Sequence, residues 1–390
     1  MQRFAPLLRA IVFLTVFAAV VIFVNSTPVP EVSVSTRTPT ATSTISIEPA
    51  PLSPIVVPQI IAPEVATSST TQATTPPKKV TLPPIKKPTP APVPVVTPVT
   101  ISVVPSPALS SSGNNALDDS ATALRAALVN ILCYAPVGSP IHSISGSGVI
   151  IDPKGIILTN AHVAQHLLLA DKGVSCTIRA GSPAADSYVA SLIYLPPAWV
   201  NANADILTKV APIGTGEHDF ALLAVTKSAT NVSLPSSFPY IELAKTPLAS
   251  GTPVVIATYG AQFLASSQVQ SGLFPTIVFG SVKDIFTFAV NTVDVIALGG
   301  SAAAQEGSSG GGVADASSKL IGTITTSTVE GATDTRSLDA ITASYIRADY
   351  TRDAGLPFDS LLATPTATSI ANFAPQMPAL ESILTASLSH

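Results

Sequence analysis

Three short segments, far apart in the chain, contain residue types that together can turn an alcohol into a nucleophile. His162 follows the hairpin sequence "GSGVIIDPKGIILTNA", Asp219 begins the apolar stretch "DFALLAV", and Ser309 lies in "EGSSGGGV". A serine hydroxyl is a poor nucleophile at neutral pH, so a neutral imidazole must take its proton as it attacks. A buried carboxylate that accepts the other ring N–H holds the imidazole in the required tautomer. The three residues are therefore candidates for nucleophile, base and orienting acid.

The glycines around Ser309 allow two interpretations. A glycine–serine run is usually a flexible spacer, and a lone histidine or aspartate at a strand end is usually structural. The order His, Asp, Ser within a strand-rich region favours catalysis instead. Acyl transfer places negative charge on an oxygen, which needs N–H donors already aimed at it. Gly307 can adopt a φ that side chains forbid and bring its N–H beside that of Ser309. Ser308 is the weaker candidate, because it lacks a glycine two residues before it.

The elements that must position these residues are predicted to be strands. Between residues 116 and 353, short apolar runs alternate with turn residues, which predicts an all-β barrel or sandwich. The runs include "ALVNILCYA", "VSCTIRA", "TPVVIATYG" and "LIGTITTST". Asp152-Pro153-Lys154-Gly155, with proline second and glycine fourth, predicts a type I turn in the hairpin before His162. A short helix is expected over residues 118–125.

These segments resemble the chymotrypsin-fold (trypsin-like) serine proteases, most closely the bacterial HtrA-like branch. "TNAHV" resembles that family's histidine motif, "HDFALLAV" its aspartate strand, "GSSGGG" its nucleophile turn and "SGSGVIID" the strand before the histidine hairpin. The resemblance covers about residues 121–350. It implies two six-stranded antiparallel Greek-key barrels and a serine endopeptidase acting on proteins or peptides. It implies these roles: His162 as general base, Asp219 as orienting acid, Ser309 as nucleophile, and the N–H groups of Gly307 and Ser309 as the oxyanion hole.

The sequence also departs from the family pattern. Gly312 stands where the family usually has proline, which we expect to loosen the nucleophile turn. A catalytically weak or inactive barrel that acts as a stalked surface binding module is therefore the alternative function. We expect no peptide-binding PDZ module after the barrels, because the segment that follows them is short. The stretches "GGSAAAQ" and "TITTS", expected to line the primary pocket, carry no charge, which predicts a preference for a small or medium uncharged side chain.

The two cysteines, Cys133 and Cys176, are either buried free thiols or a disulfide. An exported protein favours the disulfide, and the resemblance implies that their strands are neighbours. Neither cysteine has a second cysteine or a histidine at ligand spacing, so we expect no metal site. The predicted chemistry requires no cofactor.

The N-terminus predicts export. Arg3 and Arg9 precede the apolar run Ala10–Val24, an arrangement that keeps the N-terminus cytoplasmic and sends the following chain across the membrane. We expect residues 1–25 to be an uncleaved, single-pass signal-anchor helix with the protease domain outside the cytoplasm. A signal peptide cleaved after Ser26, which would give a secreted protein, is the alternative.

Composition divides the rest of the chain. Residues 26–115 hold about half of the chain's 36 prolines and no glycine as far as residue 112, which predicts a disordered, semi-rigid Pro/Thr/Ser-rich stalk. Residues 116–353 are the predicted protease domain, and residues 354–390 a disordered tail.

Charge and the remaining histidines complete the sequence-based picture. The net charge is −4 and only 11% of residues are charged, so no basic face for nucleic acid is expected. His142 and His166 are expected on the surface, and His218 is expected to be exposed despite its aspartate neighbour.

Overall fold

The structure is a computed structural model that describes residues 112–390, except 210–213, 289–291, 329, 387 and 389–390. The predicted membrane segment and nearly all of the predicted stalk lie outside the described residues. Among the helices of the described part, none combines the length and apolar character that crossing a bilayer requires.

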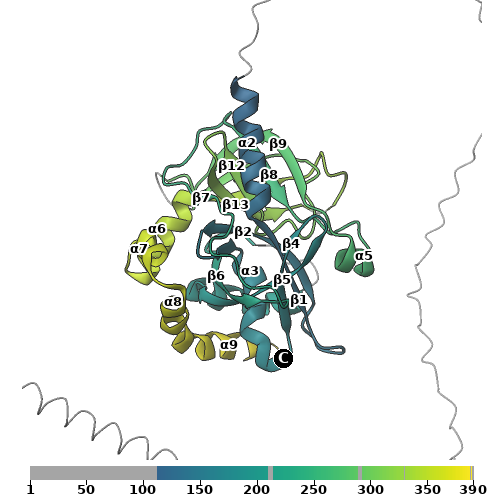
Figure 1. Cartoon of the computed structure of the whole chain (residues 1–390), viewed down its shortest axis with the longest axis vertical. Helices are drawn as coiled ribbons and strands as arrows, with labels where there is room; N and C mark the ends of the chain where they lie inside the picture. Colours follow the sequence, from purple (N-terminus) through teal and green to yellow (C-terminus); the bar gives the residue numbers. More distant parts are fainter. Residues whose placement is uncertain (1–111, 210–213, 289–291, 329, 387, 389–390) are drawn as a thin grey trace, which may run out of the picture. The chain divides into compact units, whose positions relative to one another are not determined.

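The first β unit is a closed six-stranded barrel with the order β1-β2-β3-β6-β5-β4 (Figure 1). Its strands are β1 (Leu128–Tyr134), β2 (Ile144–Asp152), β3 (Ile156–Thr159), β4 (Ser175–Gly181), β5 (Ala184–Tyr194) and β6 (Ala221–Ser228). All neighbouring pairs are antiparallel. In the predicted turn between β2 and β3, the N–H of Gly155 donates to the carbonyl of Asp152 at 2.9 Å. The prediction of a six-stranded antiparallel barrel is confirmed for this unit.

The second β unit differs from the prediction in how it closes. Its strands are β7 (Glu242–Leu243), β8 (Pro253–Thr258), β9 (Thr276–Ser281), β10 (Asp284–Phe286), β11 (Val295–Ala297), β12 (Gly312–Asp315), β13 (Lys319–Ser327) and β14 (Leu338–Thr342). They form an eight-stranded sheet of order β10-β11-β14-β13-β12-β8-β9, and β7 adds a parallel pairing to β13. The expected closed six-stranded barrel is therefore wrong in detail.

The chain itself explains the open edge of the second sheet. The two end strands, β9 and β10, are separated only by Val282 and Lys283, so one bent segment forms both edges of the sheet. When β9 and β10 are counted as a single strand, the order β8-β9/β10-β11-β14-β13-β12 repeats the order of the first barrel. The duplicated Greek-key arrangement that the resemblance implied is thus present, with β9 and β10 joined by a bend where the expected barrel has one continuous strand.

Helix α2 (Ser112–Ala127) is longer than the expected 118–125 and leads directly into β1. Its buried side chains include Leu124, and the Ser120 hydroxyl donates to the carbonyl of Asp315 at the end of β12, at 2.7 Å. The helix therefore joins the start of the first barrel to the second sheet. Shorter helices follow: α3 (Ala161–Ala164), η1 (Gln165–Lys172), α4 (Pro197–Asn203), η2 (Ala204–Thr208) and α5 (Ser266–Ser271).

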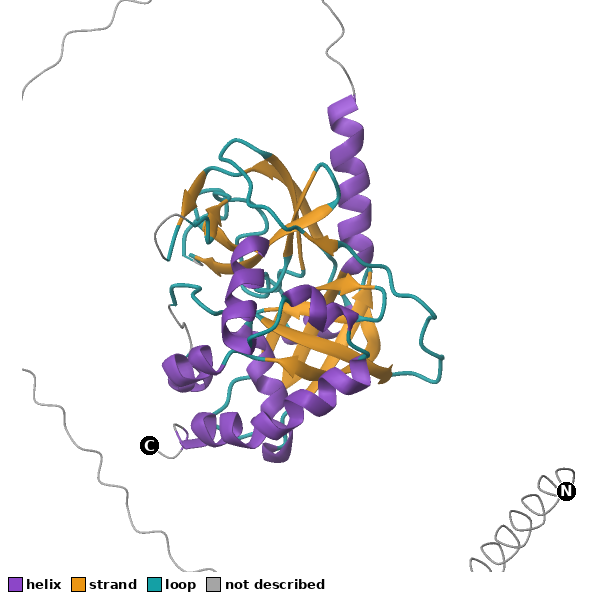
Figure 2. Ribbon diagram, turned by 90° about the vertical axis from the view of Figure 1, so that its left-hand side faces the viewer, coloured by secondary structure: helices purple, strands orange, loops and turns teal. Residues whose placement is uncertain are grey.

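The segment after residue 354, which we expected to be disordered, is helical (Figure 2). After α6 (Ala343–Ala354) come α7 (Phe358–Ala363), α8 (Thr366–Phe373), η3 (Ala374–Gln376) and α9 (Met377–Ala386). Pro357 and Pro365 are the N-cap residues of α7 and α8. The large apolar residues that α7, α8 and α9 bury are Phe358, Leu361, Phe373, Leu380 and Leu384. Helix α8 packs on β5 and α9 on η1 and α4, so the segment is held by the first barrel.

Candidate active site

His162 and Asp219 meet because β3 and β6 are paired. The register sets Thr159, at the end of β3, opposite Ala221, at the start of β6, so the residues just beyond these ends lie side by side. His162 Nδ1 is 2.8 Å from Asp219 Oδ2, and the His162 backbone N–H donates to Oδ1 at 3.0 Å. Because the carboxylate accepts from Nδ1, the neutral ring has Nε2 free to take a proton.

Two further donors hold Asp219 in place. The Thr325 hydroxyl, on β13 of the other β unit, donates to Oδ2 at 2.7 Å, and Asn160 Nδ2 donates to the Asp219 carbonyl at 2.8 Å. The Asp219 residue is buried. Burial by itself would raise the pKa of Asp219, but the charge and hydrogen bonds of His162 and the Thr325 hydroxyl outweigh it, so this pKa lies below its ordinary value. The carboxylate is therefore ionised at neutral pH.

Ser309 lies in the turn before β12, and backbone hydrogen bonds bring this turn to both partners. Ser147 on β2 donates its N–H to the Ser309 carbonyl at 2.7 Å, and the N–H of Gly310 donates to the Ile324 carbonyl at 2.9 Å. Ile324 precedes Thr325, which contacts Asp219. Within the described part of the chain, no hydrogen bond joins Ser309 Oγ to His162. Such bonds are often long or misaligned in the absence of substrate.

The turn has the backbone form expected of an oxyanion hole. Gly307 has φ +90°, which only glycine adopts readily. Among the described residues, no acceptor takes the N–H of Gly307 or of Ser309, whereas the N–H of Ser308 donates to the Gln305 carbonyl at 3.2 Å. The Ser308 hydroxyl is buried against Thr258 Oγ1 at 3.3 Å. Ser309 is only partly buried, so it is the more accessible of the two serines.

Residues 146–322 match the family model of the trypsin-like peptidase domain. The match includes His162, Asp219 and Ser309. This region is a trypsin-like peptidase domain. The match does not distinguish branches of the family, so the HtrA-like branch stays a prediction.

Two solved structures that resemble the chain are forms of the Rv3671c protease. The active form, from M. tuberculosis, is 21% identical, with coverage of 66% of this chain and 94% of that one and a TM-score of 0.39. An inactive form is 18% identical, with coverage of 63% and 96% and a TM-score of 0.37. The comparison with curated proteins gave no match.

Ser147 is a residue of the trypsin-like peptidase domain that we did not single out from the sequence. Its hydroxyl donates to the Gly307 carbonyl at 2.8 Å and accepts the Tyr259 N–H at 2.8 Å. Its carbonyl accepts the Thr159 hydroxyl at 2.7 Å. Together with its N–H bond to Ser309, these contacts fasten the turn of residues 307–309 to the barrel. The available signal was a hydroxyl residue inside the buried strand "SGSGVIID".

Contrary to our expectation, Gly312 does not loosen the turn that contains Ser309. It is the first residue of β12 and is paired with Thr323 on one side and Ala257 on the other. A Cβ atom built on it would lie 2.7 Å from Leu124 Cδ1 and 2.9 Å from Val149 Cγ2. Glycine is needed here because helix α2 packs directly on the strand, a contact that the local sequence does not reveal.

Arg336, between β13 and β14, is a buried charge near the expected substrate pocket that the sequence analysis also missed. Its guanidinium donates to the carbonyl of Ala304 at 2.7 Å, to Gln262 Oε1 at 2.6 Å and to the carbonyl of Gly331. The Phe263 ring lies 5.6 Å from it. Because protein acceptors occupy most of its donors, the predicted preference for an uncharged side chain is retained.

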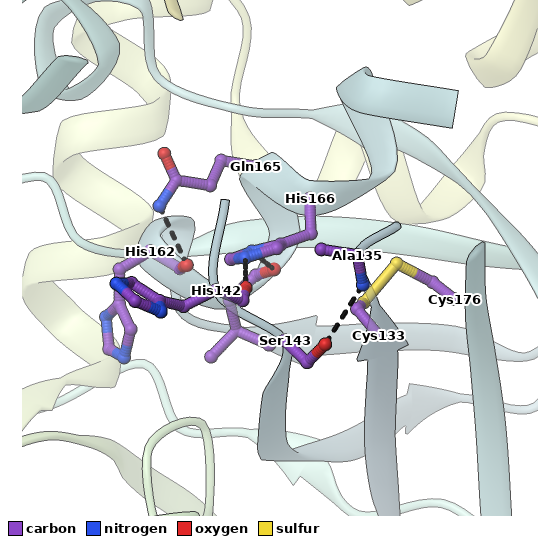
Figure 3. The surroundings of a disulfide bond; sticks show 9 residues. Cys133, Ala135, His142, Ser143, His162, Gln165, His166 and Cys176 are labelled. Atoms are coloured by element: carbon purple, nitrogen blue, oxygen red, sulfur yellow. Dashed lines mark hydrogen bonds between the residues drawn. A yellow bond between two sulfur atoms is a disulfide. The ribbon is translucent and has the colours of Figure 1, made fainter. Parts of the chain in front are cut away.

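The remaining predicted residues lie on the first barrel (Figure 3). Cys133 and Cys176 face each other across β1 and β4 and form a disulfide.

His142 is exposed, but His166 is buried, with its ring nitrogens near the carbonyls of His142 and Val163. The surface prediction for His166 is therefore wrong, because η1 folds back beneath the loop that contains His142. Burial lowers the pKa of His166. No cluster able to hold a metal ion occurs among the described residues.

Proposed function

We propose that the chain is a serine endopeptidase. In its reaction, Ser309 Oγ bonds to the carbonyl carbon of the substrate while its proton passes to His162 Nε2. The C–N bond then breaks, and the amine leaves with that proton. Water, activated by the same imidazole, hydrolyses the acyl-enzyme and restores the serine. The N–H groups of Gly307 and Ser309 stabilise the negatively charged oxygen.

One observation carries this proposal. Asp219 accepts two hydrogen bonds from His162 and one from Thr325, and Thr325 follows the residue to which the nucleophile turn is bonded. These contacts support a site in which a base and its orienting acid act with a serine turn whose proposed oxyanion-hole N–H groups donate to no acceptor in the described part of the chain. The packing of Gly312 removes the main sequence argument for an inactive binding module.

Labelling with a fluorophosphonate probe tests the nucleophile. The folded domain, residues 112–390, should be labelled, and Ser309→Ala should abolish labelling. Ser308→Ala is the matched control and should be labelled like the wild type. Labelling that survives in Ser309→Ala would show that another residue is the nucleophile.

We also propose that the protease domain functions outside the cytoplasm, anchored by residues 1–25. The apolar run Ala10–Val24 after Arg3 and Arg9 supports this, and so does the disulfide, because disulfides persist in oxidising compartments. In cells that express the full chain, externally added proteinase should digest the domain, and it should remain with the membrane after alkaline extraction. Release into the medium would favour cleavage of the N-terminal segment.

A further inference from the structure

Next to Asp219 the chain has a second histidine–carboxylate pair, which the sequence analysis treated as an exposed histidine. His218 Nδ1 donates to Asp349 Oδ2 at 2.7 Å, and the His218 backbone N–H donates to the Tyr345 hydroxyl at 3.0 Å. The Asp349 side chain is only 2% exposed and also accepts a hydrogen bond from Arg352. Asp349 and Tyr345 both belong to α6. Helix α6 therefore binds the residue that precedes the proposed catalytic acid.

The backbone at His218 is strained. Its φ is +58°, a region that non-glycine residues rarely occupy and that persists only where surrounding contacts enforce it. Two backbone hydrogen bonds close the turn around His218. The His218 carbonyl accepts the Phe220 N–H at 2.8 Å, and the Asp219 N–H donates to the Gly216 carbonyl at 3.1 Å. The observed strain therefore marks a turn whose shape is set by its neighbours.

The pairing of β6 does not reach this turn, because the strand begins only at Ala221. Before that point Asp219 is tied to the barrel by Asn160, through its carbonyl, and by the bonds of its carboxylate. The path of the chain into Asp219 is set at His218, where the ring and the N–H are both bound by α6.

We propose that His218, Asp349 and Tyr345 are positioning residues that orient Asp219 toward His162. This inference rests on the proposed function. A displacement of about 1 Å in a catalytic group can cost roughly 10²-fold in rate. Loss of the α6 contacts should therefore lower kcat and change KM little, because the group that shifts does not bind the substrate.

Asp349→Ala in the described domain is the principal test. We expect kcat to fall by about 10- to 100-fold with KM changed less than about threefold. His218→Asn is the conservative variant, because asparagine tolerates positive φ and its amide can donate to Asp349; it should lose less activity than His218→Val. Arg352→Gln is the matched control. It removes the exposed partner of Asp349 but leaves His218 bound, and kcat should stay near the wild-type value.

A double-mutant cycle separates positioning from general destabilisation. In an Asp219→Asn background, Asp349→Ala should cost little further activity, because the group that it positions is already lost. If Asp349→Ala does not fold, Tyr345→Phe removes the acceptor of the His218 N–H and tests the same turn. An unchanged kcat in a folded variant, or an equal loss in both backgrounds, would overturn the inference alone. An unchanged kcat in Asp219→Asn would overturn the proposed function, and the inference with it.

Discussion

The chemistry proposed for single residues depends on the carboxylate of Asp219, which accepts three hydrogen bonds. Asn at this position keeps the shape but no longer fixes the tautomer of His162, so we expect kcat to fall about 10⁴-fold in Asp219→Asn. Thr325→Val, which removes one donor, should cost about tenfold. Initial rates on a peptide substrate measure both effects. The control is Asp284→Asn, on the exposed strand β10, and a loss there comparable to that in Asp219→Asn would contradict the assignment.

The pH dependence of activity separates the acid from the base. Burial acts to raise the pKa of Asp219, but the charge and hydrogen bonds of His162 and Thr325 bring it below its ordinary value, so Asp219 stays ionised from pH 5 to pH 8 and adds no inflection there. A general base must be unprotonated to accept the Ser309 proton. We therefore expect kcat/KM to fall with decreasing pH before Asp219 is protonated. A profile that stays flat until Asp219 is protonated would argue against an imidazole base.

Titration of Asp219 also affects stability. Because its pKa in the folded state is depressed, the stability that it contributes is present above the ordinary aspartate pKa, about 3.9, and is lost as the pH falls further. The free energy of unfolding should therefore fall more steeply with decreasing pH in the wild type than in Asp219→Asn. Denaturant titrations between pH 5 and pH 2 measure the difference.

At the scale of elements, the contact between α2 and β12 depends on a missing side chain. In Gly312→Ala the new Cβ would lie 2.7 Å from Leu124 Cδ1, so we expect a loss of about 1–3 kcal/mol in the free energy of unfolding. Urea unfolding measures it. Because Leu124 is the nearest of the contacts, with Leu320 and Val149 each at 2.9 Å, the double variant with Leu124→Ala should be more stable than the sum of the two single losses predicts. Simple additivity would show that Leu320 and Val149, and not the helix, resist the methyl group.

At the scale of the whole molecule, the C-terminal helices belong to the folded domain. Leu380 on α9 is 3% exposed, whereas Leu356, between α6 and α7, is 58% exposed. We expect Leu380→Ala to lower the free energy of unfolding by about 2–5 kcal/mol and Leu356→Ala to change it by less than about 0.5 kcal/mol. Thermal or urea unfolding of the two variants gives the comparison. Equal, small effects would mean that α9 is only loosely attached.

The sequence alone was sufficient for features whose signal is local. Strand alternation and turn residues predicted the β units, and the hairpin around Asp152 and Gly155 has the expected hydrogen bond. The proposed nucleophile turn could be chosen because glycine is demanded by backbone conformation, and Gly307 does have a positive φ. Each of these depends on a few neighbouring residues.

Only the tertiary structure decided the features that depend on distant partners. The Ala, Thr, Pro and Ser composition of residues 354–390 led us to expect disorder, but their apolar residues are buried against a barrel whose last strand ends more than a hundred residues earlier. Gly312 was misjudged because Leu124 lies far from it in sequence, and His218 because its partners are on α6. Contacts between residues far apart in the chain leave no periodic trace in either segment, so composition and spacing cannot report them.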